Sequence, residues 1–211
     1  MPVDGPLYPV NLVLAGESCL VVGGGRVAAT KVAGLVECRA QVDVVAPEIV
    51  EAIAADERVT CHRRPYRPAD LEGRRLVISA TGDPDVDGAV YRDAEAQGIL
   101  VNSADDPAHC RATLPSRVRR GPILVTVSTE GRSPAVATWL RRRIEAELGP
   151  EHEALLEIVS AEREAIRSEG RSTEGLDWQR ALDSGMLDLI REGRTDEAKE
   201  LLRRCLSSSS A

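Results

Sequence analysis

Apolar and polar positions alternate along the first half of the chain in a way that predicts strands separated by helices. Short runs rich in Val, Leu and Ile are bounded by Gly, Pro and Asp, whereas longer stretches between them repeat apolar residues at helical spacing. Strands are expected at about 18–22, 41–46, 59–62, 75–80 and 99–102, with helices over about 26–38, 47–53 and 83–97. Strands and helices that alternate at this spacing predict an α/β fold, a Rossmann-type doubly wound parallel sheet.

The pattern changes after Asn102. Two apolar runs, 112–118 and 122–128, flank a short turn that ends in Gly121, which predicts an antiparallel hairpin. Ser133 and Pro134 then give the N-cap and first residue of a helix, and the chain beyond Gly149 is helical in pattern throughout. We therefore predict three domains: 1–111 for the nucleotide, 112–149 as a small α+β dimerisation domain, and 150–211 as a C-terminal helical region.

The turn after the first strand carries a dinucleotide-binding fingerprint. Gly23-x-Gly25-x-x-Ala28 matches the glycine pattern in which backbone N–H groups at a helix N-terminus hold a pyrophosphate. Gly23 permits the tight turn, Gly25 lets phosphate approach the backbone, and Ala28 allows close packing of helix on strand. The fingerprint alone is also compatible with a glycine-rich turn in another α/β protein, so its context decides.

Ligands of such sheets bind beyond the carboxyl ends of the strands, which selects the residues expected to contact the cofactor. The strand at 41–46 lacks the usual ribose-binding acid at its end, so Glu48 or backbone groups are expected to hold the ribose. No basic residue stands at that strand end to bind a 2′-phosphate, which favours NAD over NADP. The expected cofactor-binding residues are Gly23, Gly24, Gly25, Arg26, Val27, Ala46, Pro47, Glu48, Thr81, Asp83 and Asn102.

Composition narrows the functional classes. The chain has 211 residues and a formal charge of -7, and aromatic residues make up only 2%. Net acidity and the scarcity of stacking residues argue against nucleic acid as a partner. Five scattered cysteines without a CxxC pair indicate reduced thiols and a cytoplasmic location, and neither a signal peptide nor an apolar run of membrane-spanning length is seen.

Two neighbouring acids, Asp105 and Asp106, follow the strand at 99–102. Adjacent carboxylates beside a cofactor can raise one pKa towards that of a useful base, although Asp-Asp-Pro is also a common helix start. Both roles are compatible if Asp106 caps a helix and Asp105 faces the pocket. The three histidines lie far apart in the sequence and give no metal-ligand spacing.

Arginines gather between the hairpin and the helix after it, which is unusual for an acidic chain. Guanidinium groups suit carboxylates and phosphates, so an anionic substrate is one reading, and a solvated face or subunit ion pairs is the other. The second reading is preferred for 141–143. The expected substrate-binding residues are Arg117, Arg119, Arg120, Ser128 and Arg132.

Taken in order, several short motifs resemble the precorrin-2 dehydrogenase / sirohydrochlorin ferrochelatase family, the siroheme synthase type. The similarity covers roughly residues 8–148. It rests on Pro9-Val10-Asn11-Leu12, Leu20-Val21-Val22-Gly23-Gly24-Gly25-x-Val27-Ala28-x-x-Lys31, Val44-Val45-Ala46-Pro47-Glu48, Ala80-Thr81-x-Asp83-Pro84, Val101-Asn102-x-x-Asp105-Asp106-Pro107 and Gly131-x-Ser133-Pro134.

The resemblance implies NAD-dependent oxidation of precorrin-2 to sirohydrochlorin, in many members followed by insertion of ferrous iron. It places the functional aspartate at Asp105 and implies a homodimer built through the hairpin and the helix after it. Glu130 departs from the family pattern, which often has glycine there, and Arg111 replaces a frequent aromatic residue. A non-enzymatic NAD sensor and a dehydrogenase of another polycarboxylate remain alternative readings.

Overall fold

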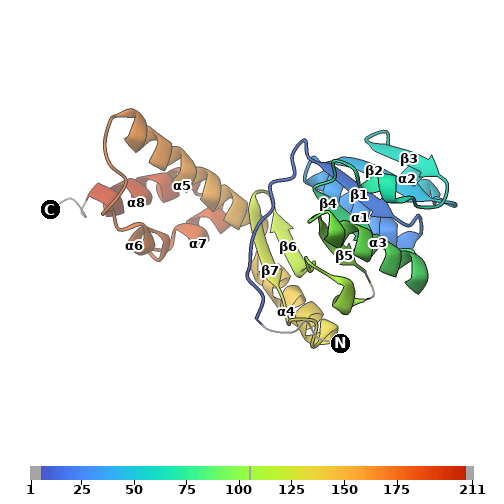
Figure 1. The fold of residues 1–211 in the computed structure, drawn as a ribbon. Helices are drawn as coiled ribbons and strands as arrows, with labels where there is room; N and C mark the ends of the chain where they lie inside the picture. Colours follow the sequence, from blue (N-terminus) through green and yellow to red (C-terminus); the bar gives the residue numbers. More distant parts are fainter. Residues whose placement is uncertain (1–5, 105, 208–211) are drawn as a thin grey trace. The chain divides into compact units, whose positions relative to one another are not determined.

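The computed structural model describes residues 6–104 and 106–207 (Figure 1). The chain forms two compact units, each described here by itself. The first unit contains the residues up to Leu114 together with Thr129–Pro134, and the second contains Pro115–Ser128 together with the residues from Ala135 onward. The hairpin and the last helices therefore share one unit, and the division into three domains remains a prediction.

The first unit is built on a five-stranded parallel sheet, as predicted. Its strands are β1 (Ser18–Val22), β2 (Gln41–Ala46), β3 (Val59–Arg63), β4 (Leu76–Ser79) and β5 (Leu100–Ser103). The order is β3-β2-β1-β4-β5, with every neighbouring pair parallel. The direction of strand addition reverses between β1 and β4, and the crevice at that switch point is where such sheets bind ligands.

Both faces of the sheet are covered, which explains why its strands read as near-continuous apolar runs. One core packs β1, β2 and β4 against α1 (Arg26–Glu37) and α2 (Glu51–Ala54). The other packs the opposite face against α3 (Pro84–Ala96) and the 3₁₀ turn η1 (Pro68–Leu71). A doubly wound sheet is therefore confirmed.

The helix predicted to begin at Pro47 begins later, at Glu51. The segment after β2 is held against the glycine loop, because the N–H of Val50 donates to the carbonyl of Gly24 at 2.9 Å. That bond uses an extended backbone at Val50, which therefore precedes the helix as its N-cap. Docking on the glycine loop outweighs the local helix signal of a proline in the first turn.

An ion cluster lies within the sheet, away from its carboxyl edge. Asp43 of β2 accepts from Nε2 of His62 at 2.8 Å and pairs with Arg74, whose guanidinium also donates to Ser18 Oγ at 2.7 Å. Burial raises the pKa of Asp43, but the hydrogen bonds from His62 and Arg74 outweigh it and hold the pKa below its ordinary value. Asp43 is thus committed to contacts within the scaffold.

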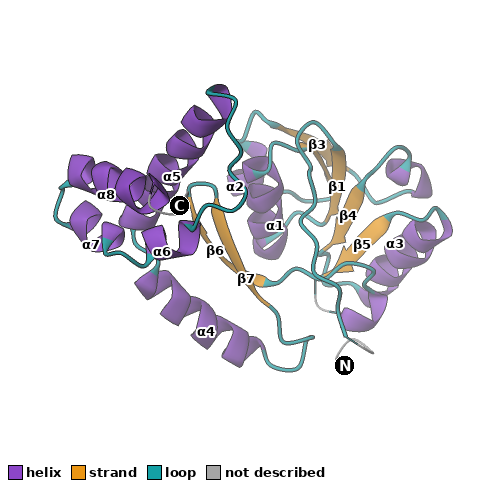
Figure 2. Ribbon diagram, turned by 90° about the vertical axis from the view of Figure 1, so that its left-hand side faces the viewer, coloured by secondary structure: helices purple, strands orange, loops and turns teal. Residues whose placement is uncertain are grey.

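The second unit joins a hairpin to helices (Figure 2). β6 (Ser116–Arg120) and β7 (Ile123–Val127) pair antiparallel around Gly121, as predicted. α4 (Pro134–Glu147) begins at the predicted proline, and its residues from Ala135 belong to this unit. α5 (Pro150–Ser168), α6 (Trp178–Leu182), α7 (Met186–Arg191) and α8 (Thr195–Ser207) enclose a core around Ile158, Met186 and Leu202. Within the described ranges, none of the helices has the length and apolar character needed to cross a bilayer.

Candidate cofactor site

The glycine loop after β1 is held between two neighbouring loops at the carboxyl edge of the sheet. A Cβ on Gly23, whose φ is +123°, would lie 2.3 Å from the carbonyl oxygen of Ala80, and one on Gly24 would lie 2.0 Å from that of Glu48. The N–H of Gly23 donates to the Val45 carbonyl at 3.0 Å. The first two glycines are therefore required by close backbone packing, which brings the ends of β1, β2 and β4 together.

Gly25 is different, because a Cβ there would meet no atom of the described residues within 4 Å. It is the N-cap of α1 and offers no side chain to the first N–H groups of that helix, which lack partners within an α-helix. Beside it, Val27 is 48% exposed although it is apolar. Open space beside the first N–H groups of a helix fits the pyrophosphate of a dinucleotide.

The end of β2 supplies the surroundings expected for the adenosine ribose. Ala46 is buried, whereas Pro47 and Glu48 are exposed, and the backbone of Glu48 abuts Gly24. Sequence reasoning missed Arg63, which ends β3 opposite Ala46 in the parallel register and is exposed. Arg63 is found near Ala46 only from the strand order. Glu48 and Arg63 thus give the carboxyl edge of the sheet one acidic and one basic residue.

The loop after β4 contains Thr81 and Asp83, both predicted to contact cofactor. Asp83 caps α3, because its carboxylate accepts from the N–H of Asp85 at 3.0 Å and of Val86 at 3.4 Å. Thr81 is half-buried and is hydrogen-bonded to Asp87 on the first turns of α3. The capping role of Asp83 agrees with the sequence, whereas the contact of Thr81 with Asp87 depends on tertiary structure.

The end of β5 is tied down by a thiol. Cys110 Sγ accepts from the N–H of Ser103 at 3.2 Å and lies 3.4 Å from the carbonyl oxygens of Ser103 and Asp106. Burial raises the pKa of this thiol, so it stays protonated. Asn102 is buried, and its amide donates to the Ala112 carbonyl at 2.9 Å. The amide nitrogen of this predicted cofactor residue is thus used to fix the chain after the loop.

The two adjacent acids have separate outcomes. Asp106 caps the 3₁₀ turn η2 (Pro107–His109), accepting from the N–H of Ala108 at 3.0 Å and from His109 Nδ1 at 2.7 Å. The hydrogen bond from His109 holds the pKa of Asp106 below its usual range. The predicted cap is confirmed, on a turn rather than a full helix. Asp105, the predicted catalytic residue, lies outside the described residues.

The predicted substrate ligands are divided between the units. Arg117, Arg119, Arg120 and Ser128 belong to the second unit, and Arg132 belongs to the first. Arg120 donates through Nε to the Leu148 carbonyl at 2.9 Å, so part of its guanidinium anchors the end of the chain segment after α4. Arg132 is exposed, and its N–H donates to the Thr129 carbonyl at 2.9 Å.

The loop before α4 has a conformation that makes the departure of Glu130 from the family pattern unfavourable. Its φ is +54°, in the left-handed region, and Gly131 follows with a φ of +74°. A non-glycine residue in this conformation costs about 1–2 kcal/mol relative to glycine. The backbone therefore has the shape that a glycine would favour, and this chain places a carboxylate there.

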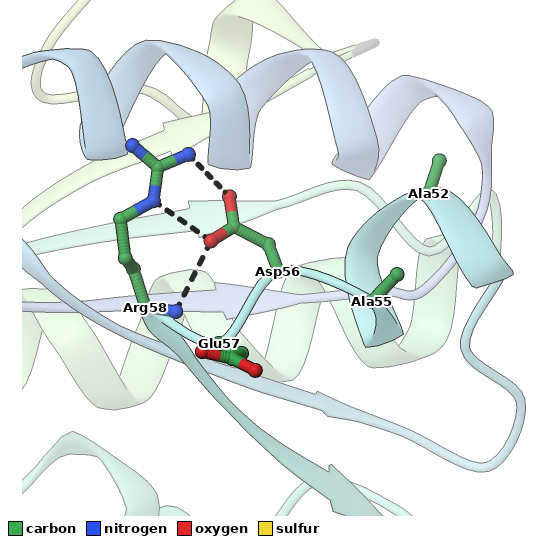
Figure 3. A pocket seen from close by; sticks show the side chains of 5 residues that line it. All are labelled: Ala52, Ala55, Asp56, Glu57 and Arg58. Carbon is green, nitrogen blue, oxygen red and sulfur yellow. Dashed lines mark hydrogen bonds and ion pairs between the residues drawn. The ribbon is translucent and has the colours of Figure 1, made fainter.

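A surface hollow on the first unit lies away from the glycine loop. It is lined by Ala52, Ala55, Asp56, Glu57 and Arg58 (Figure 3). Asp56 accepts two hydrogen bonds of 2.8 Å from the Arg58 guanidinium and one of 3.1 Å from its N–H, which lowers the pKa of this carboxyl. These residues precede β3 and so lie at the amino end of that strand, opposite the edge where parallel sheets bind nucleotides.

The fold and the glycine loop together define a dinucleotide-binding protein. A family model described as putative NAD(P)-binding matches residues 10–116, just over half of the chain, and one described as sirohaem biosynthesis protein central matches residues 120–147. The chain therefore belongs to the precorrin-2 dehydrogenase / sirohydrochlorin ferrochelatase family, as its motifs indicated. Residues 10–116 are its NAD(P)-binding domain.

Individual relatives agree with this assignment. The chain is 36% identical over 203 residues to a siroheme synthase of Nitrosococcus oceani and 35% identical over 205 residues to one of Methylobacillus flagellatus, each alignment covering 94% of this chain. It spans only 43–44% of the length of those proteins. The solved structure of SirC, a precorrin-2 dehydrogenase, shares the fold with a TM-score of 0.69 and 23% identity, over 94% of this chain and 98% of that one.

Proposed function

We propose that this chain oxidises precorrin-2 to sirohydrochlorin with NAD in siroheme biosynthesis. The observation that carries the proposal is the open pyrophosphate cradle at Gly25, in a chain similar over 94% of its length to siroheme synthases. Siroheme synthesis includes a step in which the tetrapyrrole loses two electrons. The part of a siroheme synthase that resembles this chain contains the NAD(P)-binding domain, so this part suits the oxidation.

The chemistry requires a hydride acceptor and a proton acceptor. Bound NAD supplies the hydride acceptor at its nicotinamide. We assign the proton to Asp105, which lies two residues after β5 in the sequence. Gly23, Gly24 and Gly25 with the start of α1 hold the pyrophosphate, and Glu48 holds the ribose. Arg117, Arg119, Arg120, Ser128 and Arg132 are proposed to bind the substrate carboxylates.

The purified chain should convert precorrin-2 to sirohydrochlorin while one NADH forms per product, because a hydride and a proton leave the substrate together. Absorbance at 340 nm and the spectrum of the tetrapyrrole would follow the reaction. NADP in place of NAD tests the influence of Arg63, and added ferrous iron tests chelation. NAD binding without oxidation would instead support the sensor reading, and oxidation of another polycarboxylate alone would exclude precorrin-2 as the substrate.

A homodimer mediated by about residues 112–148 is part of the same proposal. Of the residues 134–147, all described, only Ala137 is buried, while Val136 and Trp139 are 47% and 56% exposed. A twofold partner would bury this face. Sedimentation should therefore show a dimer at micromolar concentration, and Trp139→Glu should shift it towards monomer. A wild-type chain that sediments only as a monomer would contradict the prediction.

A further inference from the structure

The carboxylate of Asp87, which belongs to none of the sequence motifs, accepts several hydrogen bonds from the end of β4. Asp87, in the first turn of α3, is half-buried, and its Oδ1 accepts from the hydroxyl of Ser79, from Thr81 Oγ1 at 2.7 Å and from the Thr81 N–H at 3.3 Å. Ser79 is 0% exposed. Three donors from one strand end thus converge on a single oxygen of the following helix.

Thr81 links this carboxylate to the cap of α3. Its hydroxyl lies 2.7 Å from Asp87 Oδ1 and 3.2 Å from the Asp83 carbonyl, and it accepts from the Asp83 N–H at 3.0 Å. A hydroxyl has a single proton, and the shorter contact to a charged acceptor takes it. The hydroxyl therefore donates to Asp87 while it accepts from Asp83, which fixes the direction of the whole chain of hydrogen bonds.

The loop after β4, which these hydrogen bonds hold in place, also packs directly against the glycine loop. The Ala80 carbonyl oxygen and the Thr81 nitrogen lie 2.3 Å and 3.1 Å from the position that a Cβ on Gly23 would take. The N–H of Ala80 donates to the Val22 carbonyl at 2.8 Å. A shift of Thr81 therefore moves backbone that is in direct contact with the first glycine of the dinucleotide fingerprint.

We propose that Asp87 is a positioning residue for the dinucleotide, acting through Thr81 on the crevice between β1 and β4. The inference deepens the proposed function at its cofactor site, yet it requires only that the domain bind NAD. Without the carboxylate, the Thr81 N–H and the buried Ser79 hydroxyl lose their acceptor, and the loop relaxes to find others. The crevice is then no longer preorganised for the cofactor, so the affinity for NAD falls.

Calorimetric titration with NAD, together with the melting temperature, tests the proposal in the full chain. Asp87→Ala should weaken NAD binding about tenfold, the equivalent of one lost hydrogen bond. Asp87→Asn keeps an acceptor oxygen and should stay within about threefold of wild type. Ser79→Ala, the matched control, removes a donor to the same carboxylate without touching Thr81, so it should lower the melting temperature and leave affinity within about twofold.

A folded Asp87→Ala protein with wild-type NAD affinity would overturn the proposal. Equal losses of affinity in Asp87→Ala and Ser79→Ala would do the same, since they would show a general loss of stability. If Asp87→Ala does not fold, Asp87→Leu decides, because it fills the space of the carboxylate without offering an acceptor to Thr81: a loss of about fivefold or more supports the proposal, and a smaller loss contradicts it. A wild-type chain that does not bind NAD would reject both the proposed function and the role of Asp87. A wild-type chain that binds NAD but does not oxidise precorrin-2 would reject the proposed function alone, and the NAD affinities of the variants would still decide the role of Asp87.

Discussion

Asp105→Ala should reduce sirohydrochlorin production at least tenfold while NAD affinity and melting temperature stay close to wild type. A well-placed general base contributes about 100- to 10,000-fold to a proton-transfer step, and the oxidation of precorrin-2 loses a proton along with the hydride. The rate of NADH formation with precorrin-2 measures the effect directly, and iron insertion is measured on the same variant. Full dehydrogenase and chelatase rates in Asp105→Ala would show that the catalytic role is wrong and that the residue is structural or confined to substrate positioning.

Asp106→Ala is the matched control for that experiment. The Asp106 carboxylate caps η2 and accepts from Ala108 N–H and His109 Nδ1, so its loss should lower stability by roughly 1 kcal/mol, as for other N-caps. Its effect on the rate should be smaller than that of Asp105→Ala. A reversed order, with Asp106 controlling the rate and Asp105 the stability, would exchange the roles assigned to the two acids.

The second large effect is expected at Gly25. Gly25→Val places a branched side chain where no described residue lies within 4 Å, so the fold should survive. The same side chain occupies the space proposed for the pyrophosphate, and NAD affinity should fall by about 100-fold or more, beyond the loss of a single contact. Titration with NAD, with the melting temperature as a check on folding, measures both parts of the expectation.

Gly24→Ala, at the neighbouring residue, is expected to reduce the stability of the fold, in contrast to Gly25→Val. Its Cβ would lie 2.0 Å from the Glu48 carbonyl oxygen, and backbone on both sides must move. We expect a loss of stability of about 3 kcal/mol or more, at the upper end for overpacked sites. If Gly25→Val instead unfolds the chain or leaves NAD affinity unchanged, Gly25 does not form the cradle.

Much of the first unit could be predicted from sequence because its signals are local. β1 and β2 begin and end where their apolar runs do, and Asp83 caps α3 as its position before a proline indicates. The glycine fingerprint predicted the turn between β1 and α1 for the same reason, since the turn, the helix start and the glycines are adjacent in the chain. These features depend on covalent neighbours and on the period of the pattern.

The parts that sequence could not supply depend on register and on packing between distant segments. Arg63 neighbours Ala46 only because β3 pairs with β2, and Cys110 ties β5 only because the chain turns back after η2. Asp87 is a helical acid like many others until α3 brings it to Ser79 and Thr81. The late start of α2 has the same origin, because a long-range bond to Gly24 holds Val50 extended.

The three glycines after β1 are expected to be conserved for different reasons in proteins that descend from this chain. Drift at Gly23 and Gly24 is blocked by the carbonyl groups packed on them, so both would persist in a lineage that had abandoned its cofactor. Gly25 has no such neighbour among the described residues and would be the first of the three to mutate once nothing bound there. A paralogue that keeps the first two glycines and has lost the third is therefore a degenerate enzyme or a repurposed scaffold, although a search for the fingerprint would score it almost as highly as a working dehydrogenase.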